Sequence, residues 1–197
     1  KRLSIIKSCV KELRTFFPDT IPVLVTKEED ANKIIELINK IEFGAVQLHY
    51  SKSEDQISKL RGIFGDQIKI FQVITMDQNF QLNSDADLTI LDKSFLGGTG
   101  KQIDLSSLTS FLDKISSNKI LLAGGGSMNN IHDYSHLKIS GFDIQSSVKG
   151  VSVGKFQNTD YNRMLDTAKI LGYTVSDQDR QVGFAIQDIL QNNSNLL

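Results

Sequence analysis

Six short runs of aliphatic and β-branched residues recur along the chain. In each run the apolar residues are mostly continuous and do not alternate with polar ones. This pattern is typical of strands that are buried on both faces, as in a parallel sheet. The six predicted strands are Ile21–Thr26, Gly44–His49, Ile68–Ile74, Asp87–Leu91, Lys119–Ala123 and Gly141–Gln145.

Apolar residues at helical spacing occupy the segments before and between these runs. Because a helix repeats every 3.6 residues, each set forms one stripe that can pack against a sheet. Ser4 is a candidate N-cap for the first helix, and Met128–Leu137 is a shorter, weaker helical candidate. The predicted helices are Ile5–Phe17, Ala31–Ile41, Ile57–Phe64, Leu105–Ile115 and Tyr161–Leu171.

The predicted strands start 23, 24, 19, 32 and 22 residues apart. Strands and helices that alternate at this spacing give right-handed βαβ units and a parallel sheet, either open and doubly wound or closed as a (β/α)8 barrel. We expect residues 1–172 to form one domain, because no compositional linker divides them. Residues 173–197 form an extension with one amphipathic helix, Val182–Leu190, and a polar end that we expect to be frayed.

Composition narrows the function classes. The 197 residues are 40% hydrophobic, which is enough for a real core, and 22 basic against 23 acidic residues argue against a nucleic-acid partner. A single cysteine excludes a disulfide framework and favours a reducing compartment, the cytoplasm. No apolar run reaches the length of a membrane helix, and no signal-peptide pattern occurs. Because the sequence starts at Lys1, we expect its natural start to lie upstream.

Three turns rich in glycine or serine follow predicted strands, at Gly97–Lys101, Gly124–Ser127 and Ser146–Gly150. Backbone N–H groups in such turns can approach an anion closely, and barrels hold phosphate with the turns after their last strands. We therefore predict phosphate binding, and the alternative is that these residues only make tight turns. Gly97–Lys101 is not a P-loop, because Gln102 follows the lysine, and no GxGxxG motif follows a strand.

Polar side chains stand at or near the ends of three predicted strands. Asp92 directly follows the fourth strand, where a barrel carboxylate points into the catalytic mouth and suits general acid chemistry; the alternative is a helix or loop cap. Asp143 lies inside the last strand, where a charge is costly unless it serves a ligand or an ion pair. His49 also ends a strand, a position that is more often structural than catalytic.

His132 and His136 are four residues apart without a third ligand nearby, so we expect a solvated face and no metal.

Taken in order along residues 1–171, these motifs resemble the phosphoribosylanthranilate isomerase family of tryptophan biosynthesis. Each motif alone is weak, but the ordered set is specific. The matching runs are Val46–His49, Leu91–Asp92 followed by Gly97–Lys101, Ala123–Gly125, Asn129–Ile131, and Asp143 followed by Ser146–Val148.

The resemblance implies a (β/α)8 barrel with about six of its eight units in this sequence. It also implies an Amadori rearrangement, in which phosphoribosylanthranilate, an aminoaldose phosphate, becomes an aminoketose phosphate without a cofactor. By this likeness Asp92 is the general acid, and Arg2, His49 and Asp143 contact the substrate. The implied phosphate-binding residues are Gly98, Gly100, Gly124, Gly125, Ser146 and Ser147. The expected partner is a small sugar phosphate, and no membrane partner is expected. The protein is expected to be a monomer or a homodimer.

The family's general base is a cysteine on the first strand, in a Lys-Ile-Cys-Gly type of motif that this sequence lacks. The one cysteine, Cys9, falls on the helical stripe of Ile5–Phe17, so we expect a buried helix residue and not the base. The likeness begins at the family's second helix. We therefore expect an upstream segment to supply the first strand, the first helix, the second strand and the base.

Other functions stay open at this point. Tyr50, Ser147 and Lys149 depart from the family pattern and allow a diverged relative that binds phosphate without catalysis or with another specificity. A different sugar-phosphate barrel would carry lysine-rich or metal-ligand strand ends, which these six strands do not show. An interaction protein would explain the tail helix within Asp177–Leu190, but it would leave the glycine turns unexplained.

Overall fold

A computed structural model describes residues 2–49, 54–75, 82–92, 105–115, 119–124, 131–134, 136–144, 148–153, 156–172 and 174. Six strands, β1 to β6, are hydrogen-bonded in chain order, and β7 and β8 form a separate pair. The chain divides into two compact units. One comprises Lys1–Phe95 and Ser117–Leu121, and the other comprises Leu96–Ser116 and Leu122–Leu197.

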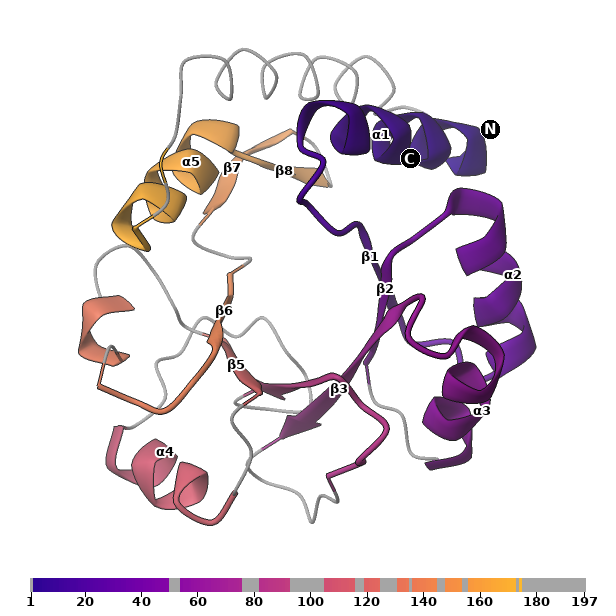
Figure 1. The fold of residues 1–197 in the computed structure, drawn as a ribbon. Helices are drawn as coiled ribbons and strands as arrows, with labels where there is room; N and C mark the ends of the chain where they lie inside the picture. The colour runs from indigo at the N-terminus through magenta and orange to yellow at the C-terminus, as the bar shows by residue number, and fades with distance from the viewer. Residues whose placement is uncertain are drawn as a thin grey trace. The chain divides into compact units, whose positions relative to one another are not determined.

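In the first unit, helices and strands alternate as the sequence predicts (Figure 1). Strands β1 to β4 pair in parallel with a continuous register, which ends with Thr75 opposite Asp92. A strand order that follows the chain without reversal is that of a barrel, because a doubly wound sheet reverses at a switch point. The elements are α1 (Arg2–Phe16), β1 (Val23–Thr26), α2 (Ala31–Ile41), β2 (Ala45–Leu48), α3 (Glu54–Phe64), β3 (Lys69–Thr75), β4 (Leu88–Asp92) and the start of β5 (Ile120–Ala123).

The ends of α2 are fixed by local hydrogen bonds. The side chain of Asp30 caps its start by accepting a hydrogen bond from the N–H of Asn32 (2.9 Å). The helix ends at Glu42, which has a left-handed φ of 62° and donates its N–H to the carbonyl of Ile38 (2.8 Å). Arg14 of α1 donates from Nη2 to the carbonyl of Glu42 (2.6 Å). This bond ties α1 to the end of α2.

One expected helix start is wrong. Helix α1 begins at Arg2, so that Ser4 lies within its first turn and is not the N-cap. The apolar stripe that located this helix begins at Ile5, although the first turn also contains Leu3, which is 44% exposed. Apolar periodicity therefore places the body of a helix better than its first residues.

Strand residues alternate between two faces of the sheet, and the core shows which face the helices cover. Val46 and Leu48 of β2 and Ile70 of β3 pack in one cluster with the apolar sides of α2 and α3. In Figure 1, α2 and α3 lie on the same side of these strands. Because side chains alternate along a strand, the residues directly before and after Val46, Leu48 and Ile70 face away from the helices. The other buried members of the cluster are Ile34, Ile38, Ile57, Leu60, Phe64 and Ile68.

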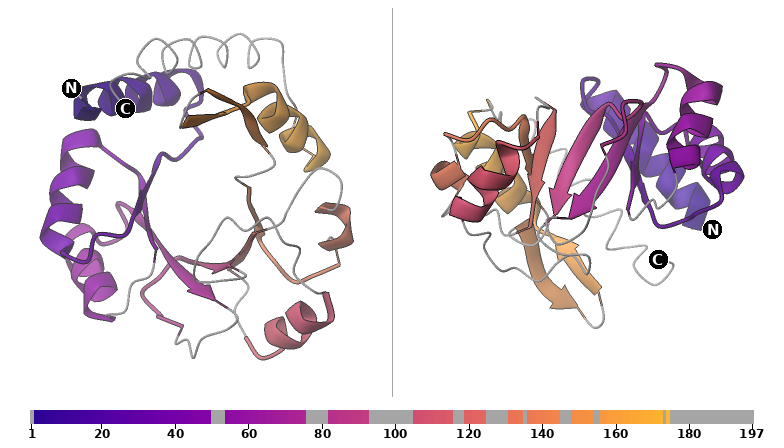
Figure 2. Two further views of the ribbon diagram at one scale, coloured as in Figure 1. Left: turned by 180° about the vertical axis from the view of Figure 1, so that it is seen from behind. Right: turned by 90° about the horizontal axis from the view of Figure 1, so that it is seen from below.

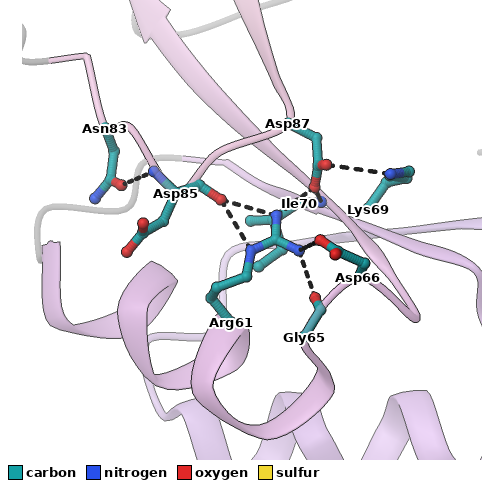
Figure 3. Close-up of polar contacts among 8 residues, drawn as sticks. All are labelled: Arg61, Gly65, Asp66, Lys69, Ile70, Asn83, Asp85 and Asp87. Atoms are coloured by element: carbon teal, nitrogen blue, oxygen red, sulfur yellow. Dashed lines mark hydrogen bonds and ion pairs between the residues drawn. The ribbon is translucent and has the colours of Figure 1, made fainter.

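A set of polar contacts, the Arg61 cluster, joins the end of α3 to the N-terminal ends of β3 and β4 (Figure 3). Arg61 binds the carboxylate of Asp87 through Nη2 and donates to the carbonyl of Asp85 (2.8 Å). Asp87 also accepts from the N–H of Ile70 (2.8 Å) and from Nζ of Lys69 (3.3 Å). The Arg61 and Asp87 side chains are only 21% and 18% exposed, so water screens this pair less than a surface ion pair.

The second unit holds the end of β5 and the remaining elements. Within the segment predicted as a weak helix at Met128–Leu137, residues Ile131–Tyr134 form a short 3₁₀ helix. Tyr134 packs edge-on against Phe142 with ring centroids 6.1 Å apart. The helix expected at Val182–Leu190 lies outside the described residues. The elements are α4 (Leu105–Leu112), η1 (Ile131–Tyr134), β6 (Gly141–Asp143), β7 (Lys149–Val153), β8 (Phe156–Thr159) and α5 (Tyr161–Ile170).

The sequence did not predict the antiparallel strand pair β7–β8 (orange in Figure 2). Lys149 and Gly150 belong to β7, although they were expected at the end of a phosphate-binding turn. The run mixes glycine, serine and lysine with valine, so it lacks the continuous apolar character of a strand buried on both faces. Arg163 of α5 donates from Nη1 to the carbonyl of Lys149 (2.9 Å), which ties the hairpin to α5.

Candidate functional site

Asp92 is the last residue of β4, as the sequence predicts for a strand-end carboxylate. Its side chain is 8% exposed. The register pairs Phe71 with Leu88 and Thr75 with Asp92, and paired residues of parallel strands share a face. Phe71 neighbours the helix-facing Ile70, so Asp92 lies on the face away from α2 and α3. In a barrel this face and this strand end form the place of catalysis.

Thr75 ends β3 and is a residue that the sequence reasoning missed. It is 3% exposed, and its Oγ1 atom is buried without a hydrogen-bond partner among the described residues. The predicted strand stopped at Ile74, one residue too early. A hydroxyl directly after an apolar run was the available signal, and only the register shows that it lies beside Asp92.

His49 follows β2 and continues its ladder, because its N–H donates to the carbonyl of Thr26 (2.9 Å). The residue is half-buried. By strand alternation it shares a face with Gln47, which is opposite to that of Leu48, and therefore with Thr75 and Asp92. The first unit thus gathers polar side chains from three neighbouring strand ends on one face.

In the second unit, Asp143 is the last residue of β6 and is half-buried, whereas the sequence suggested a buried strand. Gly124 directly follows β5 with a φ of 80°, a conformation that side-chain-bearing residues rarely adopt. This conformation is compatible with both the phosphate-binding and the tight-turn interpretation, so the two stay open. The other expected phosphate-binding residues lie outside the described residues. They are Gly98, Gly100, Gly125, Ser146 and Ser147.

Helix α1 holds Arg2, which was expected to contact the substrate, and Cys9, which was not expected to be the base. Arg2 is its first residue, and its side chain is outside the described part of the chain. Cys9 lies within the helix, as predicted, and is half-buried. Burial raises the pKa of its thiol above the usual 9.0, and the charge of Glu12 raises it further. A general base of this kind needs a lowered thiol pKa, so this environment does not suit the role.

His132 and His136 are both exposed. No group of three candidate metal ligands occurs among the residues that the structure describes. None of the described helices has the length and apolar character needed to cross a membrane.

Strands ordered along the chain, with a carboxylate and a hydroxyl side by side at neighbouring strand ends, place the chain in the (β/α)8-barrel class, whose catalytic residues lie at these strand ends. Comparison with known proteins agrees with this class. A family model described as N-(5'phosphoribosyl)anthranilate (PRA) isomerase matches residues 5–155, and the chain belongs to this family.

Two named relatives support the same family. The chain is 33% identical over 150 residues to N-(5'-phosphoribosyl)anthranilate isomerase of Staphylococcus haemolyticus, across 71% of this chain and 70% of the relative. It is 34% identical over 128 residues to the tryptophan biosynthesis protein TrpCF of Buchnera aphidicola, across 64% of this chain but only 27% of that protein.

A solved structure shows the fold. It is a phosphoribosyl anthranilate isomerase in complex with reduced 1-(o-carboxyphenylamino)-1-deoxyribulose 5-phosphate. The two structures superpose with a TM-score of 0.59 at 18% sequence identity, across 85% of this chain and 78% of that one. Strands β1 to β6 and the helices that alternate with them therefore form a partial (β/α)8 barrel.

Proposed function

We propose that this chain is an isomerase that converts N-(5'-phosphoribosyl)anthranilate into the corresponding 1-deoxyribulose phosphate. The observation that carries the proposal is Asp92, a buried carboxylate at the end of β4 within the segment that matches the family. In this rearrangement the first sugar carbon is reduced while the second is oxidised. The two changes cancel within one molecule, so the reaction is an intramolecular oxidoreduction that needs no external electron carrier.

Asp92 is proposed as the general acid. Its proton passes to the ring oxygen of the ribose as the ring opens and the protonated Schiff base forms. A base then takes the proton from the second sugar carbon, and the resulting enolamine becomes the ketone. General acid catalysis of this kind typically contributes about 10²–10⁴-fold in rate. We do not assign the base to Cys9, because its helical position and raised pKa oppose that role.

The other site residues are proposed from the family likeness and from their places in the fold. His49 shares the inner face with Asp92, and Asp143 ends β6. Both are proposed to contact the substrate, together with Arg2 of α1. The turns that contain Gly98, Gly100, Gly124, Gly125, Ser146 and Ser147 are proposed to hold the phosphate. A cytoplasmic location and a monomeric or homodimeric state also stay predictions.

A diverged relative without catalysis is the second candidate. It is favoured by Tyr50, Ser147 and Lys149, which differ from the family pattern. Such a protein would bind the sugar phosphate and leave it unchanged.

Turnover of the full-length natural protein separates the two candidates. We expect the fluorescence of phosphoribosylanthranilate to fall faster than its spontaneous rate, in proportion to the enzyme added. Calorimetric titration with reduced 1-(o-carboxyphenylamino)-1-deoxyribulose 5-phosphate measures binding separately. Binding without turnover would favour the second candidate, and the lack of both would contradict the proposed function.

A further inference from the structure

The hydroxyl of Thr75 is a polar group with no structural purpose among the described residues. Its Oγ1 is buried and makes no hydrogen bond there, and the whole residue is 3% exposed. An unsatisfied buried hydroxyl costs free energy, whereas valine has nearly the same shape and carries no such cost. Packing alone therefore accounts for a β-branched residue at this position, but it does not account for the hydroxyl.

Two other buried polar side chains among the described residues have hydrogen-bond partners. Gln56, 5% exposed, donates from Nε2 to the carbonyl of Glu28 (2.8 Å). Thr167, 4% exposed, bonds through Oγ1 to the carbonyl of Arg163 (2.7 Å). The Thr75 hydroxyl thus differs from buried polar groups that serve the fold.

Its position indicates what it serves. Thr75 and Asp92 are register partners at the carboxyl ends of β3 and β4, and both lie on the face away from α2 and α3. Neighbouring strands in a sheet lie about 4.8 Å apart. A molecule that touches the Asp92 carboxyl from that face is therefore within reach of the Thr75 hydroxyl.

We propose that Thr75 is a substrate-contacting residue whose Oγ1 hydrogen-bonds an oxygen of the polyhydroxylated sugar chain beside Asp92. A hydroxyl can both donate and accept, so it matches the hydroxyl groups of an opened pentose phosphate. This inference rests on the proposed function and names a contact within that site. In the bound state the buried hydroxyl gains a partner, which it lacks among the described residues.

Two substitutions test the contact in the full-length protein. Thr75→Val removes the hydroxyl and keeps the shape, and Thr75→Ser keeps the hydroxyl. We expect Thr75→Val to lower kcat/KM by about tenfold and to weaken binding of the reduced analogue by about the same factor, the scale of one neutral hydrogen bond. Thr75→Ser should stay within about threefold of the wild type, and the denaturation midpoint of Thr75→Val should equal or exceed that of the wild type.

Thr89→Val is the matched control. Thr89 of β4 is 6% exposed, and its register partner Gln72 lies on the helix-facing side. Loss of the Thr89 hydroxyl should therefore leave binding of the analogue unchanged. Wild-type affinity and kcat/KM in Thr75→Val would overturn the inference while leaving the proposed function intact. A wild-type protein that neither binds the analogue nor turns over substrate would instead reject the proposed function. A destabilised Thr75→Val, with Thr75→Ser equally impaired in binding, would assign Thr75 to packing and also overturn the inference.

Discussion

Arg61 and Asp87 join the last turn of α3 to the residue that precedes β4, through a contact between Nη2 and Oδ2. Burial of the Asp87 carboxyl raises its pKa, but the hydrogen bonds from Ile70 and Arg61, together with the positive charge of Arg61, outweigh burial. The pKa of Asp87 therefore lies below its usual 3.8. The ionised form is the one that the fold stabilises.

We predict that Asp87→Asn lowers the free energy of unfolding by about 2 kcal/mol at pH 7, the value of charge-assisted hydrogen bonds. Because the folded-state pKa is lowered, the contribution is fully present above the unfolded-state pKa near 4 and is lost as the pH falls through the folded-state value. Urea denaturation at pH 7 and pH 3 should therefore show a smaller difference between mutant and wild type at pH 3. Asp66→Asn is the control, because Asp66 is 97% exposed and should change stability little. An equal difference at both pH values would contradict the assigned role of the Asp87 charge.

We predict that Asp92→Asn reduces kcat by about 10²–10⁴-fold, because the amide cannot give a proton to the ring oxygen. Binding of the reduced analogue should change much less than kcat. Steady-state fluorescence kinetics and calorimetry measure the two quantities. Asp113→Asn, at an exposed residue after α4, serves as the control with unchanged kcat. A nearly normal rate in Asp92→Asn would remove Asp92 from the role of acid.

Cys9→Ser should leave turnover of the full-length protein within about twofold of the wild type. The thiol lies on a helix, and its raised pKa keeps it protonated near neutral pH. The same rates, measured side by side for both proteins, check this. A loss of 100-fold or more in Cys9→Ser, with an unchanged denaturation midpoint, would show that Cys9 takes part in the chemistry.

Two substitutions on α3 test the core of the first unit. Leu60 is 0% exposed, and Leu60→Ala should lower the free energy of unfolding by about 2–5 kcal/mol through lost burial and a residual cavity. Ile63 lies on the same helix but is 53% exposed, so Ile63→Ala should cost less than about 1 kcal/mol. Guanidinium denaturation measures both. Equal effects would mean that α3 does not pack on the sheet through the face described.

The strands of the parallel sheet could be predicted because burial on both faces leaves a direct mark, a continuous apolar run. The hairpin β7–β8 could not, because its residues mix glycine, serine and lysine with valine. The start of α1 was misplaced because Arg2 and Ser4 are polar, and Leu3 between them is exposed and adds nothing to the core.

In the candidate site, too, one residue could be singled out from the sequence and another could not. The position of Asp92 at a strand end was predicted from the sequence, because a charged residue at the end of an apolar run stands out. Thr75 was not, since threonine is common in strands and is neither charged nor a typical catalytic residue. Its significance depends on register, and register arises from pairing between segments that lie far apart along the chain. The expected phosphate turns stay predictions.

The Arg61 cluster, at the N-terminal ends of β3 and β4, affects the positions of side chains at the C-terminal ends of these strands. The hydrogen bond from the Ile70 N–H to Asp87 holds the start of β4 in place against β3. A slip of one residue between these strands would turn every side chain of β4 to the other face. Leu91 would then occupy the position opposite Thr75, and the carboxylate of Asp92 would point toward the helices. The hydrogen bond between Ile70 and Asp87 thus fixes the register of β4, and this register places the carboxylate of Asp92 beside Thr75.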